Sequence, residues 1–271
     1  GWISSAGKYI KKFEDQFSDY CECAEGVTTT SGTTAIHLAL KSLGVGPGDE
    51  VLVPAFTMVG SVYPIVQCGA SPVFVDSEPD TGNMDIQDLE RKITSASKVI
   101  LIVHIYGHPV DMDPVCDLAR SRNLKIVEDA AEAHGALYKG RKAGSLGDVG
   151  CFSFYANKII TTGEGGMVVS NDAALINKAR RLKDLAHGKI RFTHDLPEAF
   201  NYRMTNIQAA IGLGQLERIE DTIGKKIQNA EQYTRLLKDV SSLMLPVCRP
   251  WARNVYWMYG VQLMDNDRFT K

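Results

Sequence analysis

Apolar residues recur every three or four positions near the start of the chain. The recurrence between residues 7 and 19 predicts an amphipathic helix. Its apolar stripe consists of Tyr9, Ile10, Phe13 and Phe17. A second helical pattern runs over residues 33–43, and Ser31 stands just before it, where a helix N-cap is expected.

Beyond residue 45, short apolar runs alternate with helical patterns. The runs predict strands over 50–54, 72–75, 98–104 and 124–128. The patterns between them predict helices over 57–68, over 85–93 with Asp85 as N-cap, and over 110–121. Such alternation is typical of an α/β domain with a mainly parallel sheet. Two long helical patterns follow, over 171–187 and 206–237, and the second is long enough to link two domains.

Composition narrows the class of protein without naming a function. The 271 residues include 30 Lys and Arg against 32 Asp and Glu, which gives a net charge of −2. We therefore expect neither a nucleic acid nor a membrane as partner. Hydrophobic residues make up 44% of the chain and charged residues 23%, which excludes disordered and fibrous proteins. The longest apolar run, 99–105, is too short to span a bilayer.

The cysteines and the chain ends add two expectations. The six cysteines show no zinc-like spacing, so we interpret them as reduced thiols of a cytoplasmic protein. The chain begins at Gly1 with no signal-peptide pattern and ends at Lys271, soon after a strand-like segment at 255–263. We expect residues to be missing at both ends.

Four polar segments follow predicted strands or precede predicted helices, and ligands of α/β proteins bind at the carboxyl ends of strands. Residues 30–34 open a helix, which suits a phosphate or a plain serine cap. Residues 127–134 place acidic side chains after a buried strand, and they are interpreted either as a ligand site or as a solvated turn. Lys158 lies between an aromatic segment and a glycine-rich loop, and it is either a nucleophile or an ordinary surface lysine. Residues 200–206 precede a helix, and they either bind an anion or only cap that helix at Thr205.

Several known motifs are missing from the sequence. It contains no G-x-G-x-x-G dinucleotide fingerprint, no H-E-x-x-H and no G-x-S-x-G. Residues 135–141 resemble a P-loop, but Arg141 replaces the lysine and Ala143 has no hydroxyl for Mg²⁺, so we reject that interpretation. His37 and His104 are interpreted as core or rim residues, and no metal site is predicted.

The four segments, taken in order with residues 53–57, resemble the nucleotide-sugar aminotransferases among the fold-type I pyridoxal phosphate (PLP) enzymes. The matching stretches are Ser31-Gly-Thr-Thr-Ala, Val53-Pro-Ala-Phe-Thr, Glu128-Asp-Ala-Ala-Glu-Ala-His-Gly, Phe152-Ser-Phe-Tyr-Ala-Asn-Lys with Gly163-Glu-Gly-Gly, and Asn201-Tyr-Arg-Met-Thr-Asn-Ile-Gln-Ala-Ala. The resemblance covers nearly the whole chain. It implies a mainly parallel mixed sheet sandwiched by helices in a PLP-binding domain (1–215), followed by the start of a smaller, truncated C-terminal α+β domain (216–271).

The resemblance also implies roles for residues around the cofactor ring. Lys158 matches the catalytic lysine that binds PLP covalently. Asp129 matches the aspartate that keeps the pyridine nitrogen protonated, so that the ring draws in electrons. Glu132 stands near the ring hydroxyl, where many members have Gln. Met58 stands where many members place an aromatic residue over the ring.

Other matching positions bind the cofactor phosphate in the family. Gly32, Thr33 and Ser153 correspond to residues of one subunit that surround the phosphate. Asn201 corresponds to a residue that reaches the phosphate from the neighbouring subunit. The resemblance therefore implies a homodimer with shared active sites.

The implied reaction is a transamination of a nucleotide sugar. Glutamate, the usual donor, would leave its amino group on the cofactor, and Lys158 would carry the proton between carbons. Related sugar dehydratases have His in place of this lysine, so Lys158 favours transamination. The contexts of residues 200–204 and 254–260 are most similar to members that convert GDP-4-keto-6-deoxymannose to GDP-perosamine.

Three alternatives stay open at this point. A dTDP- or UDP-4-keto-6-deoxysugar is the closest rival substrate. A non-catalytic regulatory protein on the same scaffold is a second alternative, and an NAD-dependent sugar-modifying enzyme is a third. The aromatic residues 256–259 are interpreted as part of a core strand of the small domain, whatever the substrate.

Overall fold

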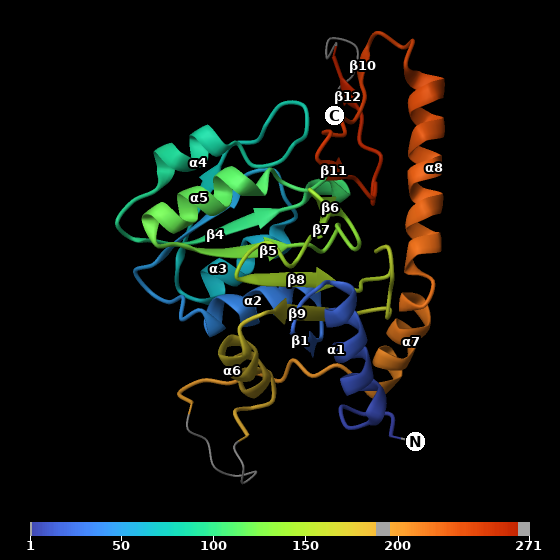
Figure 1. Ribbon diagram of the computed structural model, residues 1–271. Coiled ribbons are helices and arrows are strands. Elements are labelled where there is room, and N and C mark those ends of the chain that lie inside the picture. The colour runs from blue at the N-terminus through green and yellow to red at the C-terminus, as the bar shows by residue number, and fades with distance from the viewer. Residues whose placement is uncertain (1, 188–195, 265–271) are drawn as a thin grey trace.

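The computed structural model describes residues 2–187 and 196–264. A mixed sheet of seven strands forms its centre (Figure 1). The strand order is β1-β9-β8-β5-β4-β2-β3. The strands are β1 (Glu25–Thr29), β2 (Glu50–Pro54), β3 (Ser71–Val75), β4 (Ser97–Val103), β5 (Lys125–Asp129), β8 (Val149–Ser153) and β9 (Gly166–Ser170). β9 runs opposite to the other six strands of this sheet, which all point the same way, so the predicted mainly parallel α/β sheet is confirmed.

Helices cover both faces of this sheet (Figure 1). They are α1 (Lys8–Tyr20), α2 (Gly32–Ser42), α3 (Tyr63–Gln67), α4 (Ile86–Lys92), α5 (Met112–Arg122), α6 (Ala173–Lys183), α7 (Asn206–Leu216) and α8 (Ile219–Leu237), with 3₁₀ turns η1 (Val59–Ser61) and η2 (Ile105–Gly107). One face packs against α2, α3 and α6, and the other against α4, α5 and α1. The short strands are β6 (Leu137–Tyr138), β7 (Arg141–Lys142), β10 (Leu243–Met244), β11 (Ala252–Arg253) and β12 (Gln262–Leu263).

The apolar run of β4 shows why the sheet is buried on both faces. Successive side chains of a strand point to opposite faces. Leu101 and Val103 join the core beneath α2, while Ile100 and Ile102 join the core beneath α5. A strand covered on both faces therefore has a continuous apolar sequence and not an alternating one.

Helix starts follow the predicted capping signals. Ser31 Oγ accepts a hydrogen bond from the main-chain N–H of Thr34, and Thr34 Oγ1 accepts one from the N–H of Ser31. Asp85 caps α4 through the N–H groups of Gln87 and Asp88. These bonds satisfy donors that the first turn of a helix leaves without an intrahelical acceptor.

Three predicted elements are wrong or only partly right. The helix predicted over 57–68 is reduced to η1 and the short α3, because Pro64 has no N–H to donate within a longer helix. The pattern over 206–237 forms two helices, α7 and α8, separated at residues 217 and 218. The strand predicted over 255–263 is confined to β12, because Asn254 Oδ1 accepts from the N–H of Tyr256, whose φ of 48° bends the chain.

The end of the described chain lies above the sheet beside α8 (Figure 1). The strands β10 and β12 pair with each other, and β11 joins β6 and β7 in a three-stranded sheet. The predicted domain boundary after residue 215 falls near the break between α7 and α8, and the division into two domains stays a prediction. Within the described ranges, no helix is long and apolar enough to cross a membrane. All six cysteines are free.

His134 is fully buried in an aromatic cluster. Its ring lies 5.2 Å from the Phe152 ring, 5.8 Å from that of Phe154 and 6.2 Å from that of Phe17, between centroids. Burial, together with the nearby charge of Lys158, lowers the pKa of His134 to about 3. The folded protein therefore holds this imidazole neutral at pH values where an unfolded chain protonates it.

We expect the His134→Phe variant to lose part of the acid sensitivity of the fold. Below pH 6.5 the unfolded chain takes up a proton at His134 that the folded chain does not, so folding weakens as the pH falls towards 3. Relative to the wild type, the free energy of unfolding of the variant should increase by about 1 kcal/mol for each pH unit below 6. Urea unfolding between pH 4 and 8 measures it, and parallel curves would contradict the expectation.

Candidate active site

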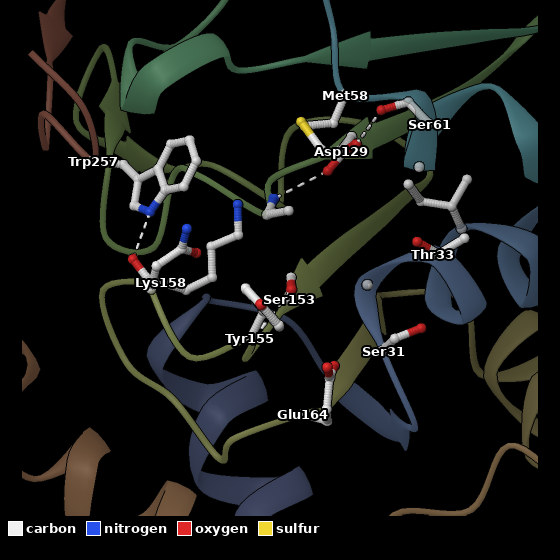
Figure 2. Close-up of a pocket in the computed structure, with 15 residues that line it drawn as sticks. Ser31, Thr33, Met58, Ser61, Asp129, Ser153, Tyr155, Lys158, Glu164 and Trp257 are labelled. Atoms are coloured by element: carbon white, nitrogen blue, oxygen red, sulfur yellow. Dashed lines mark hydrogen bonds between the residues drawn. The ribbon is translucent and has the colours of Figure 1, made fainter.

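A cavity of about 270 Å³ opens at the carboxyl ends of β5 and β8, beside the start of α2 (Figure 2). Its walls come from five separate parts of the chain. They consist of Ser31, Gly32, Thr33, Ile36, Met58, Gly60, Ser61, Asp129, Ala131, Ser153, Tyr155, Asn157, Lys158, Glu164 and Trp257. This is the edge of the sheet at which α/β proteins bind ligands.

The start of α2 forms one wall of the cavity. The first N–H groups of a helix have no intrahelical acceptor and favour an anion. A Cβ atom at Gly32 would lie 2.7 Å from Ser153 Cβ, so only glycine lets the helix approach β8 this closely. Together with the hydroxyls of Thr33 and Ser153, this wall suits a phosphate group.

Lys158 projects into the cavity from the connection between β8 and β9, and its amine lies between Trp257 and Asp129 (Figure 2). Its Nζ lies 3.8 Å from Glu132 Oε1 and 3.7 Å from the centroid of the Trp257 ring. Burial lowers the pKa of the Lys158 ammonium, while the carboxylates of Glu132 and Asp129 oppose the shift. A lysine that loses its proton easily is a nucleophile for carbonyl groups.

Asp129 is the last residue of β5, and both of its carboxylate oxygens accept hydrogen bonds. Ser61 Oγ donates to Oδ2 at 2.6 Å, and the N–H of Ala131 donates to Oδ1 at 3.1 Å. Thr57 Oγ1 lies 2.8 Å from Ser61 Oγ and donates to it, because Ser61 gives its only proton to the aspartate. Burial raises the pKa of Asp129, and these hydrogen bonds and the charge of Lys158 oppose the rise.

Glu132 lies beside this cavity and not in its wall. It lines an adjoining cavity of about 380 Å³ together with Met58, Tyr106 and Trp257, among others. Its Oε2 accepts a hydrogen bond from the main-chain N–H of Tyr106 at 2.7 Å. Burial raises the pKa of Glu132 to about 7, against the attraction of Lys158.

The structure brings together six of the eight predicted site residues in one cavity wall: Gly32, Thr33, Met58, Asp129, Ser153 and Lys158. Glu132 reaches the same amine from the adjoining cavity. Asn201 lies apart from both cavities, where its exposed side chain accepts from Arg203 Nε at 2.9 Å. The roles of all eight residues stay predictions.

Sequence patterns missed several residues of the wall. Ser61 stood inside a predicted helix, and only its spacing of four from Thr57 hinted at a shared face. The interpretation of residues 256–259 as a core strand is wrong: Trp257 lies outside any strand and places its indole against Lys158. The Trp257 Nε1–H donates to the carbonyl of Asn157 at 2.8 Å, which holds the ring there.

The wall matches the functional groups of PLP. The start of α2 suits its phosphate, the buried Asp129 carboxylate suits its pyridinium N–H, and Lys158 suits its aldehyde. Met58 provides a thioether and no aromatic ring beside the cavity, and its side chain is 64% exposed. Among the described residues, no group of three or more His, Cys, Asp or Glu side chains is arranged to hold a metal ion.

We expect the Glu132→Gln variant to lower the pKa of Lys158 further. Above a pH of about 7 the Glu132 carboxylate is charged and favours the protonated amine, whereas the amide carries no charge. The rate at which the cofactor-free protein reacts with pyridoxal, followed against pH, reports this pKa, and the profile should move to lower pH. Glu164→Gln, which changes another carboxylate of the cavity, is the control; identical profiles for Glu132→Gln and wild type would refute the coupling.

Comparisons with known proteins agree with this chemistry. The family model described as DegT/DnrJ/EryC1/StrS aminotransferase family matches residues 1–271. The chain is 48% identical to GDP-perosamine synthase of Caulobacter vibrioides over all of its own length and 73% of the relative's. It is also 48% identical to GDP-perosamine synthase of Escherichia coli O157:H7, over 96% of this chain and 71% of that protein.

A solved structure gives the same result in three dimensions. DesV of S. venezuelae, crystallised in complex with a ketimine intermediate, superimposes with a TM-score of 0.94 at 36% sequence identity. The match covers 99% of this chain and 71% of DesV. The chain therefore belongs to the DegT/DnrJ/EryC1/StrS aminotransferase family and is a PLP-dependent sugar aminotransferase.

Proposed function

We propose that this enzyme transfers an amino group from glutamate to carbon 4 of GDP-4-keto-6-deoxymannose, giving GDP-perosamine. The observation that carries the reaction type is the half-buried Lys158 amine facing the same cavity as Asp129. The substrate is supported by the GDP-perosamine synthases at 48% identity. A dTDP-linked sugar is the nearest alternative, since a dTDP-3-amino-3,4,6-trideoxy-alpha-D-glucose transaminase is 37% identical over 96% of this chain.

In this proposal a few residues of the cavity divide cofactor binding and proton transfer between them. When bound, PLP supplies an aldehyde and an electron-withdrawing ring. The start of α2, with Thr33 and Ser153, binds the phosphate, and Asp129 holds a proton at the ring nitrogen. Lys158 takes and returns a proton at Nζ, for which its lowered pKa suits it.

We also propose a homodimer in the cytoplasm, with active sites shared between subunits. Asn201 lies outside the cavity of its own chain, as expected of a residue that serves the partner's site. The segment next to the cavity exposes apolar side chains that a partner would cover. They are Met58, Val59, Tyr63 and Val66. The free cysteines fit a reducing compartment.

The substrate is tested by incubating the PLP-loaded protein with glutamate and, in turn, GDP-, dTDP- and UDP-4-keto-6-deoxyhexoses. We expect amination of the GDP sugar, seen as a mass shift. The Lys158→Ala variant should lose at least roughly 10³-fold in rate, because the base at the reacting carbon is gone. Lys142→Ala, which removes a lysine paired with Glu220 outside the cavity, should retain the rate. Amination of the dTDP or UDP sugar alone would overturn the GDP assignment, and no amination with any sugar would contradict the aminotransferase proposal.

Shared active sites are tested by mixing equal amounts of Lys158→Ala and Asn201→Ala, each of which we expect to be inactive alone. If Asn201 serves the partner's site, one site of each mixed dimer contains both native residues. Random exchange makes half of the dimers mixed, with one intact site of two, so about one quarter of the wild-type activity should return. No recovery, with subunit exchange shown by mass spectrometry, would place both residues in the site of one chain.

A further inference from the structure

Glu128, next to Asp129, is a completely buried carboxylate that the proposed reaction does not use. It accepts four hydrogen bonds, two at each oxygen. Oε1 accepts from the main-chain N–H groups of Leu146 and Gly147, both at 2.6 Å. Oε2 accepts from the N–H of Gly144 at 2.7 Å and from His104 Nε2 at 2.9 Å. These four donors occupy the acceptor positions that both oxygens of the carboxylate offer.

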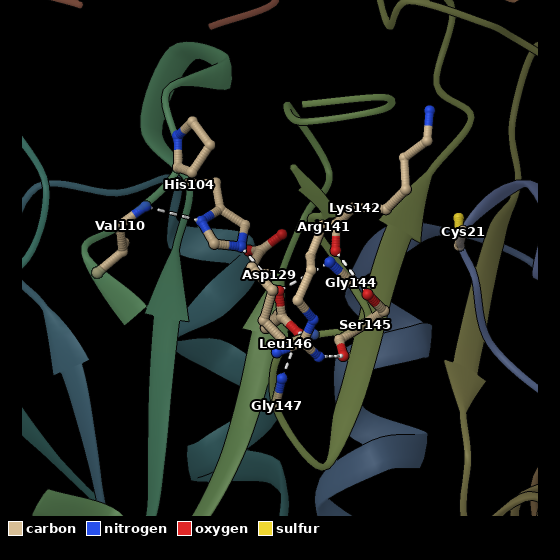
Figure 3. Close-up of polar contacts among 12 residues, drawn as sticks. Cys21, His104, Val110, Asp129, Arg141, Lys142, Gly144, Ser145, Leu146 and Gly147 are labelled. Atoms are coloured by element: carbon tan, nitrogen blue, oxygen red, sulfur yellow. Dashed lines mark hydrogen bonds and ion pairs between the residues drawn. The ribbon is translucent and has the colours of Figure 1, made fainter. Parts of the chain in front are cut away.

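The tautomer of His104 follows from the partner of its other ring nitrogen. Nδ1 accepts the main-chain N–H of Val110 at 3.0 Å and so carries no proton (Figure 3). Nε2 is therefore the N–H of the ring, and it donates a hydrogen bond to Glu128 Oε2. The main-chain N–H of His104 also donates to the carbonyl of Asp129 at 3.2 Å. His104 thus ties the end of β4 to the last two residues of β5.

The three main-chain donors lie on the loop that enters β8 (Figure 3). Two glycines let this loop lie close to β8 and β5. A Cβ at Gly144 would lie 2.5 Å from Phe152 Cζ, and one at Gly147 would lie 2.7 Å from Ile126 Cγ2. Glu128 therefore fixes β5 against the start of the strand that ends at Ser153 and leads to Lys158.

Because Glu128 and Asp129 are neighbours on one strand, fixing Glu128 also restrains Asp129. Neighbouring side chains of a strand point to opposite faces, so Glu128 points into the loop while Asp129 points into the cavity. We propose that Glu128 is a positioning residue for the cofactor: its four-donor anchor fixes the direction of Asp129 and its alignment with the ring nitrogen. This inference rests on the proposed function through the task given to Asp129.

The Glu128→Gln variant tests the proposal. An amide has one acceptor oxygen, so its NH₂ group must face two of the four donors and the anchor breaks. In this variant we expect the dissociation constant for PLP to rise about 10-fold or more. With ¹⁵N-labelled PLP, the NMR signal of the pyridine nitrogen should move towards that of the unprotonated form. Without the cofactor, amide hydrogen exchange should accelerate at residues 129–131.

Glu14→Gln is the matched control. Glu14 is also buried and accepts from Thr28, Arg180 and Lys183, but it lies on α1 outside the cavity. The Glu14→Gln variant should have a lower melting temperature, but its ring-nitrogen signal and its amide exchange at residues 129–131 should not change. Should Glu128→Gln not fold, His104→Leu removes one donor of four and should change the same signals less.

The proposal is overturned if the Glu128 or His104 variant loses stability as Glu14→Gln does but keeps wild-type exchange at 129–131 and a protonated ring nitrogen. Failure of the wild type to bind PLP would contradict the proposed function instead. In that case the exchange at 129–131 alone decides whether Glu128 positions Asp129.

Discussion

Two neighbouring carboxylates, Glu128 and Asp129, are buried at the end of one strand, and both need hydrogen-bond donors. A buried charge without partners costs several kcal/mol, so the chain around β5 must supply N–H and O–H groups on both faces of the sheet. On one face the donors come from His104 and the loop before β8, and on the other from Ser61 and Ala131. The turn η1, that loop and the residue that follows β4 each supply part of these donors.

The cavity depends equally on close approach of main chains. The start of α2 meets β8 without an intervening side chain at Gly32, and the loop before β8 meets the sheet through Gly144 and Gly147. These contacts leave space for a flat, phosphorylated ligand while the neighbouring side chains remain packed. Asp129 and the helix start therefore lie on regular elements of the fold, which favours a preorganised site, while Lys158 reaches them from the connection between β8 and β9.

Much of the architecture was predictable from the sequence because it depends on local signals. The run at 50–54 and the caps Ser31 and Asp85 specify their elements through neighbouring residues alone. The cavity residues Gly32, Asp129 and Lys158 were found through resemblance and not through periodicity. Ser61 and Trp257 were missed because their partners, Asp129 and Lys158, lie 68 and 99 positions away along the chain (129 − 61 and 257 − 158). Contacts of that kind arise only when the sheet brings distant segments together.

The reversed direction of β9 has a consequence for how such a site can change over evolution. Because β8 and β9 run antiparallel, the segment that carries Lys158 leaves the sheet and returns to it at the same edge. Parallel strands need a crossover that spans the whole length of the sheet, whereas this connection is a local excursion. Its length and its reactive residue can therefore vary without moving a helix, so new chemistry can arise on an unchanged scaffold by substitution within one hairpin.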